Sequence, residues 1–310
     1  MPGPADEAGT AGYRPLLFSI AYGMIGSVGD AEDLVQDAFL GLTRARQAGT
    51  TIIDPKAYLT TAVTRLSIDH LRSARVRRET YVGEWLPEPV VVPAEASGPA
   101  EHAELADALS MAFLVLLESL SPVERAVFML REVFGYDYPD VARIVGKTEV
   151  NCRQICTRAR RRVAAGGQAL DGARLPARRA AGEALARRFF EAADGGDIEG
   201  LLGLLAPDVV LHGDGGGKAR ALGRPMTEPG RVAQALVSGF RRIRGLGVTY
   251  RPAWVNGRPG AVMYDAEGHV AGVVGLDIAD GMVRTIHSVA NPDKLCHLGP
   301  VSGVGLLPER

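Results

Sequence analysis

The chain has little of what several specialised protein classes need. Only three of its 310 residues are cysteine, and aromatic residues make up 6%. Three cysteines cannot build a disulfide framework, so we expect a reducing, cytoplasmic location. The longest purely apolar run, residues 111–117, is far shorter than the roughly 20 residues of a membrane-spanning helix. The opening MPGPADEAGT lacks the apolar core of a signal peptide, and we expect no membrane association.

The chain also has almost no net charge, but its charges are unevenly distributed. The 35 basic and 36 acidic residues give a net charge of −1. This excludes a protein whose whole surface is basic for binding nucleic acid. Residues 65–78 and 147–179 are rich in arginine, whereas residues 79–124 carry acids and neither lysine nor arginine. This alternation favours two nucleic-acid-binding patches joined by an acidic connector. The alternative is that the arginines only form solvated helix faces.

The first segment, residues 13–80, has the pattern of three helices. An apolar helix covers residues 13–27, and the string DAEDLVQDAFLGLTRAR predicts a second helix with Asp30 as its N-cap. The string DPKAYLTTAVTRLSIDHLRSARVRRE predicts a third. Its N-cap is Asp54, Pro55 occupies the first helical position, and basic residues gather at its end.

The second segment contains a helix-turn-helix pattern. Ser121 and Pro122 begin a helix, Tyr138 begins a short helix that ends before Gly146, and Thr148 caps an arginine-rich helix. Cys152, Cys156, Ala159 and Val163 fall on one stripe of that last helix. Because a zinc site needs three or four ligands, we expect the two cysteines to pack in the core instead. Arg153 and Gln154 are placed for base edges, and Arg158, Arg160 and Arg161 for phosphates.

The third segment, residues 181–300, begins with the apolar spacing of helices and then shows the spacing typical of strands. A strand is expected through Val209, Val210 and Leu211 and a helix over residues 231–242. Further strands are expected over residues 248–255, 261–264, 270–278 and 282–290. Helices followed by an antiparallel sheet predict an α+β cone.

The strings of the first segment resemble region 2 of bacterial extracytoplasmic-function (ECF) sigma factors, and the helix-turn-helix resembles their region 4. The resemblance implies that the acidic helix docks on RNA polymerase, that region 2 opens and reads the −10 element, and that region 4 reads the −35 element. The implied polymerase-binding residues are Glu32, Asp33, Gln36 and Asp37. The implied −10 residues are Tyr58, Arg65, Arg72, Arg75, Arg77 and Arg78. The implied −35 residues are Lys147, Asn151, Arg153, Gln154, Thr157, Arg158, Arg160 and Arg161.

The third segment, with its string APDVVLHGDGGG, resembles the SnoaL-like, nuclear-transport-factor-like fold. Three short strings, WLPEP, DGGGK and NPDKL, together resemble the SigJ-like group of ECF sigma factors, in which this extension replaces a separate anti-sigma protein. The implied regulatory residues are Trp85, Pro87, Asp214, Lys218, Asn291, Pro292, Asp293 and Lys294. DGGGK lacks the full pattern of a phosphate loop. We expect a glycine turn there, with an acidic linker residue as the candidate partner of Lys218.

These observations predict a multidomain chain with two all-α sigma domains and one α+β SnoaL-like cone. The expected bounds are 10–80 for region 2, 81–105 for an extended, flexible, acidic proline-rich linker, 106–170 for region 4 and 181–300 for the regulatory domain. We expect a sigma factor, not an enzyme, that needs no metal or cofactor. Its expected partners are the RNA polymerase core, promoter DNA and, as a candidate, a small ligand of the C-terminal domain.

Two alternatives stay open at this point. The first is a helix-turn-helix regulator that works without polymerase and senses a ligand in the third domain. The second is an isomerase or cyclase fused to a DNA-binding module. Its candidate pocket residues are His212, Trp254, Tyr264, Asp277 and His287.

Overall fold

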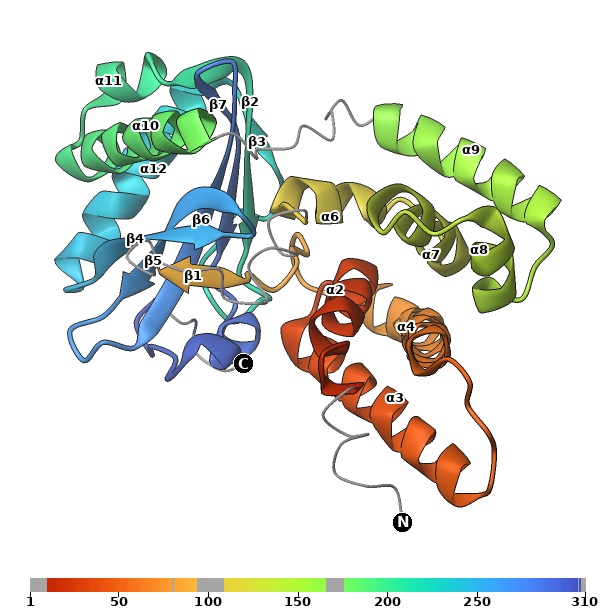
Figure 1. Cartoon of the computed structure of the whole chain (residues 1–310). Coiled ribbons are helices and arrows are strands. Elements are labelled where there is room, and N and C mark those ends of the chain that lie inside the picture. Colours follow the sequence, from red (N-terminus) through yellow and green to blue (C-terminus); the bar gives the residue numbers. More distant parts are fainter. Residues whose placement is uncertain (1–9, 80, 94–108, 166–175, 306, 308–310) are drawn as a thin grey trace. The chain divides into compact units, whose positions relative to one another are not determined.

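The computed structural model describes residues 10–79, 81–93, 109–165, 176–305 and 307 (Figure 1). These residues form two compact units. The first unit contains residues 10–79 and 113–165, and the second contains residues 81–93, 109–112 and 176–307. Regions 2 and 4 share one unit, and the described part of the linker belongs to the C-terminal unit.

In the described part of the first unit every regular element is a helix, as predicted. Its region 2 consists of α2 (Arg14–Ile25), α3 (Val28–Gln47) and α4 (Pro55–Glu79). Its region 4 consists of α7 (Pro122–Phe128), a π-helical turn (Met129–Val133), α8 (Tyr138–Val145) and α9 (Glu149–Ala165). Helix α6 (Met111–Leu117) starts in the second unit and ends in the first.

Local side-chain hydrogen bonds set most of these helix starts. Asp54 accepts the amide of Ala57 at 3.0 Å, as predicted, and Ser121 forms a capping box at the start of α7. The prediction for α3 is wrong by one turn. Its N-cap is Ser27, which is extended and accepts the amide of Asp30 through its hydroxyl, so the helix begins before Asp30.

A buried arginine fastens region 4 to region 2 within the first unit. Arg125 of α7 is 3% exposed. Its guanidinium donates to the carbonyl of Leu117 at 3.0 Å, to the carbonyl of Met24 at 2.7 Å and to the carboxylate of Glu118 at 2.8 Å. Since Met24 lies in the last turn of α2, this side chain joins α2, α6 and α7 in one network.

The second unit is an α+β fold with one mixed sheet (Figure 1). The strand order is β1-β4-β5-β6-β7-β2-β3. Among these described strands, β2 and β7 pair in parallel and the other neighbours pair antiparallel. The strands are β1 (Val91–Pro93), β2 (Leu205–Asp214), β3 (Met226–Thr227), β4 (Thr249–Val255), β5 (Arg258–Tyr264), β6 (Val270–Ala279) and β7 (Met282–Val289). The helices are α10 (Pro176–Gly195), α11 (Ile198–Leu202) and α12 (Pro229–Gly245), and two 3-10 turns, Pro292–Lys294 and Cys296–Leu298, follow β7.

The helices pack on one face of this sheet. Phe189 and Phe190 of α10 and Phe240 of α12 share a buried core with Leu211 of β2 and Ile286 of β7. Side chains alternate along a strand, so the neighbours of the last two, His212 and His287, lie on the opposite face. The prediction that these two histidines line the cone is therefore wrong.

None of the helices in the described part of the chain is long and apolar enough to cross a membrane.

Candidate DNA-binding surfaces and the docked linker

The buried side of α9 holds the helix-turn-helix together. Cys152 and Cys156 are fully buried and pack with Ile155 against Val127 and Val141. Burial raises the pKa of both thiols, which keeps them neutral in this apolar setting. The cysteines are thus core residues, as the stripe predicted.

One edge of α9 carries arginines that are already paired within region 4. The guanidinium of Arg153 lies 3.4 Å from the carboxylate of Glu149 and 4.6 Å from the ring centre of Tyr138. Arg160 donates to Glu132 at 2.7 Å, and this hydrogen bond lowers the pKa of the Glu132 carboxyl. The structure therefore places Arg153 beside α8, not on the outermost row of α9.

The outermost row of α9, opposite the cysteines, contains Gln154, Thr157 and Arg161, all exposed. Positions three, four and seven residues apart share a helix face, which puts these three side chains in line. Lys147 and Arg158 are also exposed, and Asn151 is half-buried. The residues predicted for the −35 element thus gather on one end and one side of region 4.

The residues predicted to bind polymerase share the exposed side of α3. These residues are Glu32, Asp33, Gln36 and Asp37. The opposite side of the helix is buried through Leu34, Val35 and Ala38. The four polar side chains are consequently available to a partner without disturbing the core.

The residues predicted for the −10 element all lie on α4. Tyr58 is half-buried, and Arg72 is exposed and pairs with Asp69 at 3.0 Å. The side chains of Arg75, Arg77 and Arg78 fall outside the described residues.

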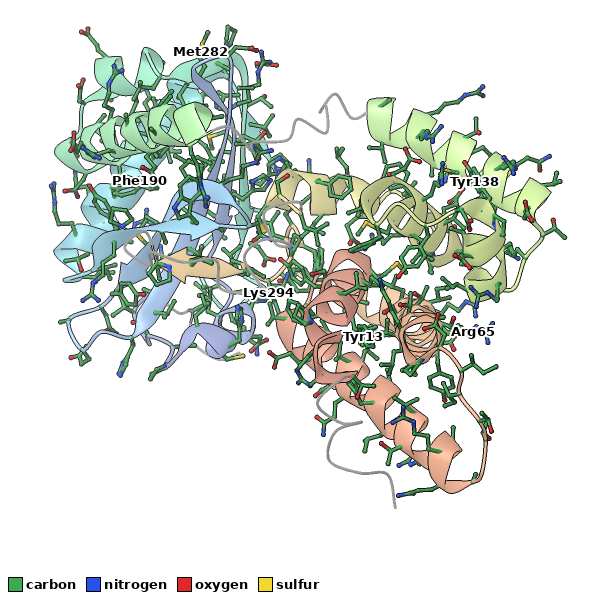
Figure 2. The ribbon with its side chains drawn as sticks, in the orientation of Figure 1. Tyr13, Arg65, Tyr138, Phe190, Met282 and Lys294 are labelled. Carbon is green, nitrogen blue, oxygen red and sulfur yellow. The ribbon has the colours of Figure 1, made fainter. Side chains whose placement is uncertain are left out.

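Arg65 makes contacts that the sequence did not suggest (Figure 2). Its guanidinium donates to the carbonyls of Ile144 at 3.0 Å and of Arg143 at 3.2 Å. A cation at a helix C-terminus is favourable, because the last carbonyls have no partner in the helix. One turn away, the hydroxyls of Thr60 and Tyr136 are 3.3 Å apart. A residue predicted to read the −10 element is thus bound to the end of α8.

The linker is held in the C-terminal unit by a buried carboxylate. Asp214, at the end of β2, is fully buried. It accepts hydrogen bonds from the hydroxyl of Tyr81 at 2.5 Å, from the amide of Leu86 at 2.8 Å and from the ammonium of Lys294 at 2.6 Å. Two of these three donors belong to the linker, so the linker supplies part of the hydrogen bonding that a buried carboxylate needs.

Lys294, which is labelled in Figure 2, makes further contacts in this cluster. Its ammonium also donates to the carbonyl of Leu86 and lies 4.9 Å from the ring centre of Tyr81 and 4.2 Å from that of Trp85. Burial and the hydrogen bond to Asp214 raise the pKa of Tyr81, so its phenol stays protonated and donates. We call Tyr81, Trp85, Leu86, Asp214 and Lys294 the linker latch.

The three motifs that resemble the SigJ-like group, WLPEP, DGGGK and NPDKL, meet at this latch. The amide of Asn291 donates to the hydroxyl of Tyr81 at 2.8 Å. Gly216 has a φ of 59°, and a Cβ there would come within 2.3 Å of Asn291, which explains the glycine turn. The expected partner of Lys218 was wrong: it pairs with Asp293 at 2.7 Å, not with a linker acid. Of the two prolines, Pro87 is buried and Pro292 begins the turn after β7.

A second polar contact holds the acidic side chain of Glu84. Its carboxylate is 2.6 Å from Nδ1 of His212 and accepts the amide of Gly213 at 3.4 Å. The ring of His212 stacks on that of His287, with centres 5.2 Å apart. Nδ1 of His287 lies 3.3 Å from the carboxylate of Asp277. This histidine pair therefore lies on the linker side of the sheet.

Asn256 fastens the linker at two points far apart in the sequence. It is fully buried in the turn between β4 and β5, with a φ of 49°. Its side chain accepts the amide of Val90 at 3.1 Å and donates to the carbonyl of Leu109 at 3.0 Å. Val91–Pro93 then pair with β4 as strand β1. The expectation of a flexible linker is wrong for its described part.

Three family models match this chain in the order that the fold suggests. Residues 11–77 match sigma-70 region 2, residues 110–163 match sigma-70 region 4, and residues 186–290 match the SnoaL-like domain. The two sigma matches coincide with the helices of the first unit, and the third coincides with the sheet and helices of the second.

Proteins with the same arrangement are known from Mycobacterium tuberculosis. The chain is 37% identical to the ECF RNA polymerase sigma factor SigJ over 91% of its own length and 90% of the relative. It is 33% identical to the probable ECF RNA polymerase sigma factor SigI, covering 94% and 96%. The crystal structure of SigJ superimposes with a TM-score of 0.73 at 32% identity, covering 94% of this chain and 98% of that one. The chain therefore belongs to the ECF RNA polymerase sigma factors with a C-terminal SnoaL-like domain and directs transcription initiation at promoters.

Proposed function

We propose that the C-terminal unit regulates this sigma factor by holding or releasing the linker between regions 2 and 4. The observation that carries the proposal is the linker latch, in which buried Asp214 and Lys294 both bind linker residues. The C-terminal unit acts in this role as a binding domain, not as an enzyme.

Docking of the linker limits how independently the two DNA-reading regions can move. Helix α4 ends at Glu79, and the docked linker begins at Tyr81. At the other end, Leu109 is held by Asn256 just before α6 begins at Met111. A released linker of this length would span on the order of 30 Å as a flexible chain. Release, together with loss of the Arg65 and Arg125 contacts between regions 2 and 4, would let the two regions adjust their separation to two promoter elements.

Groups that the proposed DNA and polymerase contacts would need are already bonded, both within the first unit and in the docked linker. Arg65 is bound to the carbonyl end of α8. Glu84 is bound to His212, and Glu88 lies 4.0 Å from His297. We infer that region 2 must leave α8 before Arg65 contacts promoter DNA, and that the acidic linker becomes available to a basic channel of the core polymerase only after release.

Within this scheme the exposed face of α3 contacts the polymerase core, α4 contacts the −10 element and α9 contacts the −35 element. The proposed polymerase contacts are Glu32, Asp33, Gln36 and Asp37. The proposed −10 contacts are Tyr58, Arg65, Arg72, Arg75, Arg77 and Arg78. The proposed −35 contacts are Lys147, Asn151, Arg153, Gln154, Thr157, Arg158, Arg160 and Arg161. Support comes from the exposure of the four polymerase contacts, of Arg65 and Arg72, and of the −35 contacts other than half-buried Asn151. The −10 residues share α4, and the −35 residues share α9 except Lys147, which lies in the turn before that helix.

Lys294→Met tests the proposed latch. The change removes the ammonium that bonds to Asp214 and to Leu86, while its apolar chain still fills much of the space. We expect amide hydrogen exchange of residues 81–93 to rise by at least ~10-fold, because a broken buried ion pair leaves an uncompensated charge. Promoter-specific transcription with core polymerase should change in the same variant.

Lys218→Met is the matched control, since Lys218 also pairs with NPDKL but is 57% exposed. It should leave both linker exchange and transcription close to those of the unchanged protein. Faster linker exchange in Lys294→Met without any change in transcription would remove the regulatory role. Unchanged exchange would show that the latch does not hold the linker.

Gln154→Ala and Arg158→Ala should separate base reading from phosphate binding on α9. Loss of Gln154 should cost about 1–3 kcal/mol of discrimination at one −35 position, because its amide can bond a base edge. Loss of Arg158 should weaken binding to all sequences alike and lower the salt slope by about 1. Titrations of holoenzyme on matched and mismatched promoters at several salt concentrations measure both. Equal, sequence-independent losses would contradict the assignment.

A further inference from the structure

Val150 is an exposed apolar side chain on a helix that is otherwise polar on its outer side. It is the second residue of α9, and 66% of its surface is accessible. Among the described residues of region 4 it is the one large hydrophobic side chain that is exposed. An isolated exposed valine is ordinary on a protein surface. The position of Val150 in the first turn of α9 makes its exposure informative.

The start of α9 fixes the direction in which Val150 points. Thr148 caps the helix: its hydroxyl accepts the amide of Asn151 at 3.3 Å and its carbonyl accepts that of Cys152 at 3.0 Å. Because Cys152 and Cys156 face the core, the helical repeat places Val150 on the outermost row. It stands there one turn before Gln154 and two turns before Thr157.

The surroundings of Val150 suit the major groove of DNA. Basic side chains lie on both sides of the row: Arg153 and Arg160 along one edge of α9, Arg158 along the other, and Lys147 in the turn before the helix. In a helix-turn-helix the first turns of the second helix reach the base edges. The C5-methyl of thymine is the apolar group that base pairs present in that groove. A valine in the first turn, between phosphate-binding flanks, matches this group.

We propose that Val150 packs against the C5-methyl of one thymine in the −35 element and thereby determines specificity for thymine over cytosine at that position. The inference rests on the proposed role of α9 in reading the −35 element. It adds a contact that acts through shape and apolar surface, whereas the contacts proposed above act through charge and hydrogen bonds.

The test removes one methyl group at a time from the DNA. The −35 element is first selected from a random promoter library with holoenzyme reconstituted from the full chain and core polymerase. Each thymine of that element is then replaced by uracil, which lacks only the C5-methyl. With the unchanged protein, one replacement should weaken binding about 4-fold, the effect of exposing one buried methyl-sized group. Val150→Ala should bind the thymine DNA about as weakly as the unchanged protein binds the uracil DNA. Its affinity should not fall further when the thymine is replaced by uracil.

Thr157→Ser is the matched protein control, because it removes one methyl from the same row of α9. This variant should keep the uracil effect at the position assigned to Val150. Equal uracil effects in the unchanged protein and in Val150→Ala would overturn the inference, and so would the absence of any uracil effect. A loss of core-polymerase binding in Val150→Ala that is the same on both DNAs would also overturn it, in favour of a protein contact.

Arg161→Ala distinguishes failure of this inference from failure of the proposed function. If Arg161→Ala weakens −35 binding while uracil has no effect, α9 reads the element and only the valine contact is wrong. If neither change alters −35 binding, the proposed role of α9 fails together with the inference.

Discussion

Replacing Asp33 and Asp37 by lysine is expected to abolish co-purification of the chain with core RNA polymerase. Both side chains are exposed on α3, on the side away from buried Leu34 and Val35. The helix should therefore remain folded. Like charges placed opposite each other in an interface cost several kcal/mol, which is enough to abolish a typical association. Retention on immobilised core polymerase measures the loss.

Glu183→Lys with Glu199→Lys is the control for the change in total charge. Both acids are exposed in the C-terminal unit, on α10 and α11, so this pair makes the same change away from α3. It should leave core binding intact. Normal retention of a folded Asp33→Lys, Asp37→Lys variant would remove the assignment of α3 as the polymerase-binding helix.

Asp214→Ala should destabilise the C-terminal unit by about 3–5 kcal/mol, because it leaves Lys294 buried without its carboxylate. The hydroxyl of Tyr81 and the amide of Leu86 lose their acceptor in the same change. Denaturant unfolding can be followed by the fluorescence of Trp85, whose ring centre lies 4.2 Å from the ammonium of Lys294. A Trp254→Phe background makes Trp85 the single tryptophan reporter, since the chain contains two.

Asp293→Ala is the matched control for this measurement. Its pair with Lys218 is exposed, with 60% of the Asp293 side chain and 57% of the Lys218 side chain accessible. Its loss should cost no more than ~1 kcal/mol. Equal destabilisation by the two alanine variants would show that the strength of the latch does not come from burial of the Asp214–Lys294 pair.

The sequence was most informative where the structure depends on neighbours along the chain. Asp54, Ser121 and Gly146 set helix ends through contacts within a few residues, and all three were predicted. The sigma regions and the SnoaL-like domain were likewise identified from short strings of neighbouring residues. The error at α3 had the same origin, because Ser27 and Asp30 are both good caps and only the backbone conformation decides between them.

Contacts between distant residues could not be predicted in this way. Tyr81 and Asp214 are 133 positions apart, and Arg65 is 79 positions from Ile144. The proline-rich linker was expected to be flexible on composition alone. Prolines also favour an extended chain that can lie along a surface, and Leu86 and Pro87 are buried in this one. The motifs WLPEP, DGGGK and NPDKL were informative only together, since each supplies one part of the latch.

The structure and the relatives argue against both alternative functions, on different grounds. Region 2 and region 4 in one chain, with the relatives described above, favour a sigma factor over a regulator that works without polymerase. The proposed isomerase or cyclase pocket would need its acid–base residues inside the cone. His212 and His287 lie on the opposite face, and Glu84 of the linker covers the first of them.

Strand β1 has a consequence for the solution behaviour of the released state. Three linker residues pair with Val255, Trp254 and Ala253 and so form the outer border of the sheet beside β4. When the linker leaves, this stretch of β4 presents unpaired amides and carbonyls, which readily accept a strand from another molecule. We therefore expect variants with a weakened latch to self-associate as their concentration rises. The linker of this sigma factor would then protect against aggregation as well as regulate transcription.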